Sequence, residues 1–310
     1  MRRNYILLLA LLICLPWFSG EYYVNLASQI LIAAIFAASL NLLVGYAGLT
    51  SLGHASYLGL SAYISAWLSL RMGLGHAVTA PAALLLTTLI GCGFGWIALR
   101  ASGLGFLMLT LALSQIVWGL CYRWVGVTNG DNGLSGLTRP SPFGIDLGNS
   151  SAFYWFVLII TVAALYSIAR FVNSPFGATL RGTRDQWRRM SSLGYNVWGI
   201  RWVTFVFSSF LGALAGLLYV YFNKYIHPSV MSVTVSAEAL LAVIAGGSGT
   251  LAGPVVGAAL VMLLKNYASA YVERWNMLMG IVFVFIVIVM PAGIVPGTLA
   301  LLRRLRGGPR

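Results

Sequence analysis

The sequence predicts an all-α membrane protein, a polytopic helix bundle of about eight full spans plus a re-entrant or broken helix pair, in one domain over residues 1–310. Of the 310 residues, 59% are hydrophobic and only 8% are charged, whereas soluble domains carry about 25% charged residues. The mean hydropathy is +0.87. Apolar runs of about twenty residues, the length that crosses about 30 Å of hydrocarbon, recur along the chain.

These apolar runs place the spans. The first run, residues 5–18, follows Arg2 and Arg3 and could be a signal peptide, but it lacks an A-x-A cleavage site and a second run begins at Val24. We therefore expect an uncleaved first span. The other full spans are expected at residues 24–44, 51–70, 77–98, 103–121, 152–172, 202–223 and 275–296.

Basic residues predict the orientation, because cytoplasmic loops carry an excess of Arg and Lys. Alternation from a cytoplasmic N-terminus places the arginine-rich segment 173–201 inside as a cytoplasmic coupling loop and the segment 122–151 outside as a periplasmic loop. The C-terminal arginines are also expected inside, so both termini are cytoplasmic and the number of crossings is even. Residues 236–272 must then return to the outer face, either as a re-entrant or broken pair or as two full crossings.

Charge and cysteine content exclude other classes of site. The formal charge of +13, from 19 basic and 6 acidic residues, indicates orientation and contact with anionic lipid, and we expect no nucleic-acid partner. Cys14, Cys92 and Cys121 stand apart in apolar runs and predict neither a disulfide framework nor a metal site. The three histidines are too scattered along the sequence to form a metal cluster.

The stretch 236–259 is the strongest candidate for a functional site. Glu238 is an acid within an apolar run and has no basic neighbour in sequence. Ionisable groups at membrane depth nearly always face a bundle interior or a wet cavity. Gly246 to Gly249 then interrupt the helix, which is tolerated at that depth only where protein or water satisfies the backbone. We interpret the stretch as part of a solute pathway.

A soluble alternative also fits part of this stretch. Gly247, Gly249 and Ala252, with Glu273 about twenty residues later, have the outline of a dinucleotide fingerprint. That fingerprint needs a preceding strand and an alternating βα pattern, and the chain has long apolar runs instead. No G-x-x-x-x-G-K-[ST] motif occurs in the sequence, so any nucleotide hydrolysis must belong to a partner.

The outer segment 122–151 is rich in Gly, Asn, Ser and Pro and predicts a structured or partly mobile loop. We interpret Asp131 and Asp146 as turn residues rather than as contacts to a partner. The inner segment 173–201 predicts a short helix over about 183–193 that ends at Gly194 as its C′ residue. That helix either lies on anionic lipid as a topology signal or docks a cytosolic partner.

Several motifs carry a resemblance to a known family. They are NLLVGYAGLTSLGHA at 41–55, GLSGL at 133–137, SPFGATLR at 174–181 with LGYN at 193–196, and Glu238 followed by GGSGTLAGPVVGA at 246–258. Together they resemble the permease subunits of bacterial ABC importers for branched-chain amino acids and related solutes. The resemblance covers most of the chain. One departure lies in the inner loop, where Trp187, Arg189 and Met190 stand in place of the family's Glu-Ala-Ala, so we expect docking there by shape and apolar burial.

The resemblance implies an assembly and a location. Two permease subunits, two cytosolic ATPase subunits and a periplasmic solute-binding protein would work together in the bacterial inner membrane. ATP binding and hydrolysis would drive the import of a small polar solute, a branched-chain amino acid or a related amino acid or amide. This chain would be the transport subunit, without enzymatic activity or cofactor of its own.

Two sets of candidate site residues follow. Gly-interrupted segments in the two halves of a transporter point to its transport site, and the predicted pathway residues are Asn41, Ser51, His54, Glu238, Ser248 and Thr250. The sequence leaves open whether Asn41 and His54 only bridge neighbouring helices. The residues predicted to couple the chain to an ATPase are Arg184, Asp185, Trp187, Met190, Leu193 and Gly194.

Two other functional classes share some of these features. A secondary transporter or channel that does not depend on an ATPase would also contain an intramembrane Glu238 and glycine breaks, but it would not need a docking loop. A membrane scaffold or signalling subunit would not need the buried acid.

Overall fold

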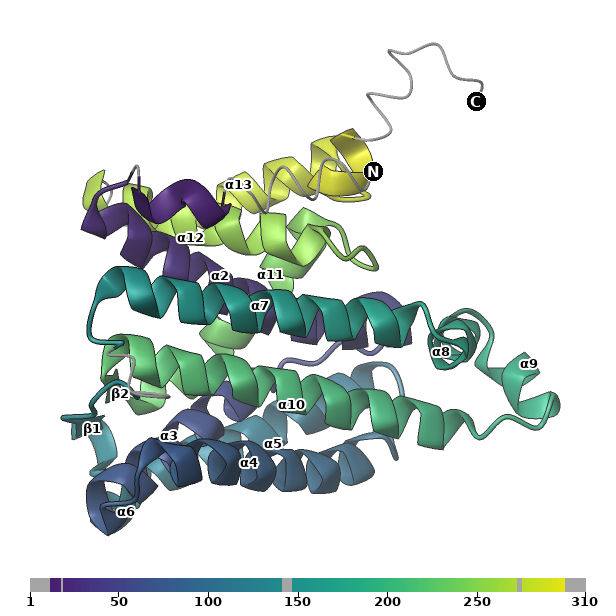
Figure 1. Ribbon diagram of the computed structural model, residues 1–310. Helices are drawn as coiled ribbons and strands as arrows, with labels where there is room; N and C mark the ends of the chain where they lie inside the picture. The colour runs from purple at the N-terminus through teal and green to yellow at the C-terminus, as the bar shows by residue number, and fades with distance from the viewer. Residues whose placement is uncertain (1–11, 18, 141–146, 272–274, 299–310) are drawn as a thin grey trace.

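The computed structural model describes residues 12–17, 19–140, 147–271 and 275–298, and the chain there is a helix bundle with one small sheet (Figure 1). The long helices lie roughly side by side, in an order that runs from α13 and α12 through α2, α7 and α10 to α3, α4 and α5. Their bounds are α2 Glu21–Asn41, continued by the π-helix η1 Leu42–Ala47, then α3 Ala55–Met72, α4 His76–Ala98, α5 Leu104–Arg123, α7 Ser150–Val172, α10 Val197–Asn223, α11 Val233–Gly246, α12 Gly253–Tyr271 and α13 Trp275–Val289. The predicted all-α membrane bundle is confirmed.

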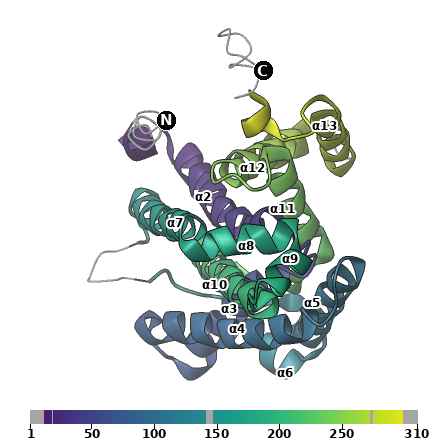
Figure 2. The same ribbon diagram turned by 90° about the vertical axis from the view of Figure 1, so that its right-hand side faces the viewer.

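The bundle has two distinct ends. At one end, the β end, the strands β1 Leu134–Ser135 and β2 Tyr225–Ile226 pair antiparallel. The short helices α6 Val125–Thr128, η2 Gly130–Asn132 and η4 Pro228–Met231 lie beside them. At the other end, the α8 end, α8 Pro175–Asp185 and α9 Trp187–Ser192 project beyond the long helices. Figure 2 looks onto the α8 end, where α8 lies across the bundle in front of α10 and contacts α7.

Helix α2 forms the centre of the core because it is apolar on nearly every side. Ala34, Ile35 and Leu40 are fully buried, as expected of a helix without a polar face, and α2 packs against α7, α10, α11 and α12. Small residues bring other helices closer. A Cβ added to Gly216 of α10 would collide with the Leu58 carbonyl of α3, so glycine permits this close contact between backbones.

Among the described residues, five helical segments are long and apolar enough to cross a membrane: Glu21–Ala47, His76–Ala98, Leu104–Arg123, Ser150–Val172 and Val197–Asn223. They correspond to five predicted spans with shifted ends. The predicted span 51–70 is the 18-residue helix α3, whose buried serines, Ser56, Ser61 and Ser65, reduce its hydropathy. The predicted span 275–296 is only 15 residues as a helix, α13. Most of the first predicted span, like both charged termini, falls outside the described residues.

The predicted pair at 236–272 is a helical hairpin, α11 and α12, broken at residues 247–252. Its turn reaches the α8 end, because Gly249 and Thr250 are hydrogen-bonded to Asn41 at the end of α2. The hairpin therefore runs from the β end to the α8 end instead of dipping in and returning at a shallow depth. The pair is broken at residues 247–252, one of the predicted alternatives, and α11, with 14 residues and a length of about 21 Å, is shorter than a full crossing of about 30 Å.

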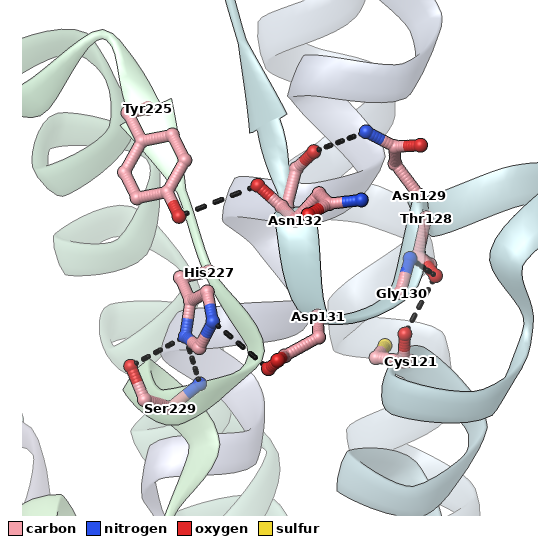
Figure 3. A network of polar contacts seen from close by, with 10 residues as sticks. Cys121, Thr128, Asn129, Gly130, Asp131, Asn132, Tyr225, His227 and Ser229 are labelled. Atoms are coloured by element: carbon pink, nitrogen blue, oxygen red, sulfur yellow. Dashed lines mark hydrogen bonds and ion pairs between the residues drawn. The ribbon is translucent and has the colours of Figure 1, made fainter.

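In the outer segment 122–151, the residues around η2 make polar contacts within the chain (Figure 3). Asp131 lies in the turn η2, as predicted for a turn residue, and its carboxylate is 3.3 Å from His227 Nε2 near the other strand of the sheet. Tyr225 donates to the Asn132 carbonyl at 3.4 Å, and Thr128 donates to the Cys121 carbonyl at 2.6 Å. The contacts of His227 and Tyr225 join the outer segment to the chain that follows α10, whereas the Thr128 bond is local. Asp146 lies outside the described residues.

The inner segment 173–201 differs from its prediction. The single helix expected over about 183–193 is two helices, α8 and α9, separated at Gln186. Helix α8 begins earlier than the predicted helix because Ser174 caps it. The Ser174 hydroxyl accepts from the Gly177 amide at 3.3 Å, and Pro175 occupies the first helical position. A capping Ser followed by Pro starts a helix, so α8 begins at Pro175, before the predicted helix.

The predicted C′ role of Gly194 is confirmed. Its φ is +86°, a left-handed conformation that glycine adopts without a steric cost. The amides of Gly194 and Tyr195 bond the carbonyls of Ser191 and Met190 at 3.0 and 3.1 Å. This pair of bonds is the Schellman motif that ends α9.

Candidate functional site

A cavity of about 360 Å³ lies between α2, α10, α11 and α12, in the half of the bundle nearer the β end. Its walls are mainly apolar, with Ile32 and Phe36 from α2, Leu58 from α3, and Ala239 and Val261 from the hairpin. A few polar side chains reach the same space: Gln29, Asn223, Glu238, Lys265 and Asn266. Apolar walls with a few convergent polar groups are typical of small-molecule sites, whose volumes are about 300–1,000 Å³.

The sequence neighbours of Glu238 suggested a lone acid, but in the structure Glu238 has a basic partner. Lys265 on α12 places Nζ 3.2 Å from Glu238 Oε2 and 3.4 Å from Oε1. The glutamate side chain is 19% exposed and the lysine side chain 42%. Sequence reasoning missed Lys265 because it lies 27 residues away and meets Glu238 only when the hairpin closes. The available signal was a second ionisable residue within an apolar segment.

Asn41 forms a junction between the two glycine-interrupted segments at the α8 end. Its side chain is 1% exposed, and it clamps the turn of the hairpin with both ends of its amide. Nδ2 donates to the Thr250 carbonyl at 2.9 Å, and Oδ1 accepts from the Gly249 amide at 2.9 Å. The early and late motifs, about 208 residues apart, are therefore in direct contact.

Arg184 adds the inner loop to the same junction. Its guanidinium donates to the Gly45 carbonyl in η1, and a Cβ at Gly48 would lie 3.0 Å from Arg184 Cγ. Gly45 is itself required by the contact, since a Cβ there would collide with Asn41 Oδ1 and the Gly249 amide. We name Asn41, Gly45, Arg184, Gly249 and Thr250 the junction. It connects α8 to α2 and to the hairpin, three elements whose sequences lie far apart.

The other predicted pathway residues lie apart from the cavity. His54 is fully buried, with Nε2 2.7 Å from Ser39 Oγ and its ring stacked on Phe36. This arrangement bridges α2 and the start of α3. Ser51 is buried and accepts from the Gly53 amide at 3.4 Å, whereas Ser248 is exposed in the hairpin turn. Glu238 alone of the six predicted residues lines the cavity, and Asn41 meets Thr250 at the junction. A pathway role for them stays a prediction.

The residues predicted to couple the chain to an ATPase differ in their exposure in the structure. Trp187 and Leu193 are 53% and 65% exposed at the α8 end. Met190 instead packs inward, with Sδ 2.9 Å from the position of a Cβ on Gly182, so the predicted apolar ridge of three residues is reduced to two exposed ones. Asp185 is exposed and lies 3.8 Å from Arg184 Nε. Gly194 contributes the helix end described above.

Metal and disulfide chemistry are not indicated by the geometry. Within the described part of the chain, no group of three or more His, Cys, Asp and Glu residues could hold a metal ion. Cys14, Cys92 and Cys121 are free thiols.

These features define a class, a multi-pass membrane protein with a charged cavity between its helices and an exposed helical segment at one end, joined by a polar junction. The chain belongs to the family described as "Branched-chain amino acid transport system / permease component", whose sequence model matches residues 22–287. The permease resemblance of the motifs is thereby confirmed.

Individual relatives agree with this assignment. The high-affinity branched-chain amino acid transport system permease protein LivM of Salmonella typhimurium is 26% identical, over 94% of this chain and 74% of its own length. LivH of Escherichia coli, the permease of the same kind of system, is 21% identical over 84% of this chain and 90% of its own. The ribose import permease protein RbsC of Haemophilus influenzae is 26% identical over 81% of this chain and 78% of its own length. No solved structure matches the chain significantly.

Proposed function

We propose that the chain is the membrane subunit of an ATP-driven importer that moves a small polar solute, a branched-chain amino acid or a related amino acid, across the inner membrane. The junction is the observation that carries this proposal. Through Arg184 and Asn41 it connects α8, in the exposed loop, with α2 and the hairpin that wall the cavity. A partner that displaces α8 would therefore act on the helices around the solute.

The partners follow from the same arrangement. The sequence contains no phosphate-binding loop, so a separate cytosolic ATPase would supply the energy and would dock on α8 and α9. We propose a second permease subunit and a periplasmic solute-binding protein as the other components, since relatives are named as permease proteins of such transport systems. The α8 end would then face the cytoplasm and the β end the periplasm. An ATPase-independent transporter is the alternative.

Truncation of the exposed apolar residues on the inner segment tests this proposal. We expect the double variant Trp187→Ala/Leu193→Ala to insert normally but to lose ATPase co-purification, because a buried Trp anchor in a protein interface contributes about 2 kcal/mol or more. The matched control is Trp124→Ala/Leu104→Ala, which removes residues that are 59% and 79% exposed outside this loop. If the Trp187/Leu193 variant co-purifies the ATPase as well as the control does, α9 is not a docking element and only lies on lipid.

A further inference from the structure

We infer that the cavity is a binding site for the zwitterionic head group of an α-amino acid, with Glu238 receiving the ammonium group and Lys265 the carboxylate. The inference rests on the proposed function and deepens it. It assigns solute recognition to the membrane subunit itself.

The first argument is the cost of placing two charges between transmembrane helices. Glu238 is only 19% exposed, so its desolvation opposes the Coulombic gain of the ion pair, and ionisable residues at membrane depth are rare unless they serve a site. Glu238 and Lys265 stand side by side in the cavity wall, with Nζ 3.2 Å from Oε2. A pair that served only to join α11 and α12 would not need to border a cavity.

The second argument is complementarity. An α-amino acid carries one positive and one negative charge close together and no net charge. Its binding would exchange the Glu238–Lys265 contact for two new ion pairs, so both charges would stay paired, as burial requires. Lys265 can make this exchange because its side chain is 42% exposed and its ammonium group sits on a flexible four-carbon stem.

The third argument is the apolar part of the cavity lining. Ile32, Phe36, Ala37 and Leu58 line the same cavity and offer an apolar surface to the side chain of the amino acid. A solute that lacked either charged group would itself offer no countercharge to Glu238 or to Lys265, and sites built this way discriminate strongly against such analogues. The cavity therefore favours aliphatic α-amino acids over their amides and over the corresponding deaminated acids.

Direct binding of radiolabelled L-leucine to the full chain in lipid nanodiscs tests the inference. We expect saturable binding at millimolar or lower concentration without ATP and without a binding protein. Leucinamide, which lacks the carboxylate, and isocaproate, which lacks the ammonium group, are each expected to compete about ten- to hundredfold less well than unlabelled L-leucine. No saturable binding, or equal competition by all three compounds, would overturn the inference.

Variants test the two residues. Glu238→Gln and Lys265→Gln are each expected to weaken L-leucine binding about ten- to hundredfold, whereas Lys265→Arg should retain most of it. The matched controls are Glu21→Gln and Lys224→Gln, which remove charges outside the cavity lining. Binding by Glu238→Gln and Lys265→Gln at the level of the controls would leave the ion pair a helix link only.

The test distinguishes loss of binding from misfolding, and failure of the zwitterion site from failure of the proposed function. A variant that fails to fold is recognised by its size-exclusion profile, and the competition series on the unaltered chain still decides the inference. Co-purification of the ATPase tests the proposed function on its own, because the binding assay contains no ATPase. Leucine binding by a chain that co-purifies no ATPase would contradict ATP-driven import alone, and ATPase co-purification without leucine discrimination would contradict the zwitterion site alone.

Discussion

Asn41 uses its whole amide to hold the hairpin turn. The oxygen accepts from the Gly249 amide and the nitrogen donates to the Thr250 carbonyl, both at 2.9 Å. The side chain is 1% exposed, so water is poorly placed to replace it. Loss of the Asn41 amide leaves the Gly249 amide and the Thr250 carbonyl unsatisfied, and because both groups are partly buried the cost is up to about 1–3 kcal/mol for each group.

We therefore expect Asn41→Ala to destabilise the folded chain by up to about 1–3 kcal/mol for each of the two orphaned groups. Thermal unfolding of the purified protein in detergent measures this as a lower melting temperature. Asn132→Ala, a change at an exposed position of the β end, is the control. Equal melting of the two variants would show that the Asn41 clamp contributes little stability.

At the scale of elements, η1 and the hairpin turn meet so closely that only glycine fits at position 45. A Cβ on Gly45 would collide with Asn41 Oδ1 and with the backbone of Gly249. Backbone cannot move aside as a flexible side chain can, and overpacking of this kind costs about 1–3 kcal/mol or more.

Gly45→Ala is expected to reduce both melting temperature and uptake, while Gly119→Ala serves as the matched control. Gly119 lies within α5 and has no heavy atom within 4 Å of an added Cβ, and alanine is a better helix former than glycine by about 1 kcal/mol. The control should be neutral or slightly more stable. A Gly45→Ala protein that melts and transports like the control would refute the close packing at the junction.

The sequence predicts elements better than it predicts contacts between them. Apolar runs located most helices, because hydrophobic length is a local property, but Ser174 and Pro175 were not recognised as the start of α8. The contacts that make the sites are non-local. Lys265 meets Glu238 across the hairpin, and Asn41 meets Thr250 over a separation of 209 residues. No periodicity in a single sequence encodes such pairings.

At the scale of the whole molecule, the described end of the chain returns to the α8 end. Gly293 and Pro296 pack against Gly247 in the hairpin turn. With the positive-inside rule, this placement predicts a cytoplasmic C-terminus, and the arginines at position 2 and 3 predict a cytoplasmic N-terminus. Tags at each end, probed from each side of the membrane, check the orientation. A periplasmic C-terminus would contradict the assignment of the α8 end to the cytoplasm.

The central claim is that the junction transmits events at α8 to the helices around the cavity. Arg184 is the residue of α8 in the junction. Its guanidinium donates to the Gly45 carbonyl, and α8 is followed in sequence by the exposed α9. Removal of the Arg184 side chain should leave ATPase docking intact but uncouple α8 from the helices around the cavity. Arg100→Ala removes an arginine that is exposed outside α8 and stacked on Trp96, so it controls for loss of positive charge.

The most direct measurement is solute-stimulated ATP turnover by the reconstituted complex of this chain with its partner permease, ATPase and solute-binding protein. For Arg184→Ala we expect normal ATPase co-purification and basal turnover, but a stimulation by solute-loaded binding protein that falls at least about tenfold, the loss of one charge-assisted hydrogen bond. Arg100→Ala should behave as the unaltered chain. Full stimulation of the Arg184→Ala complex would contradict coupling through the junction.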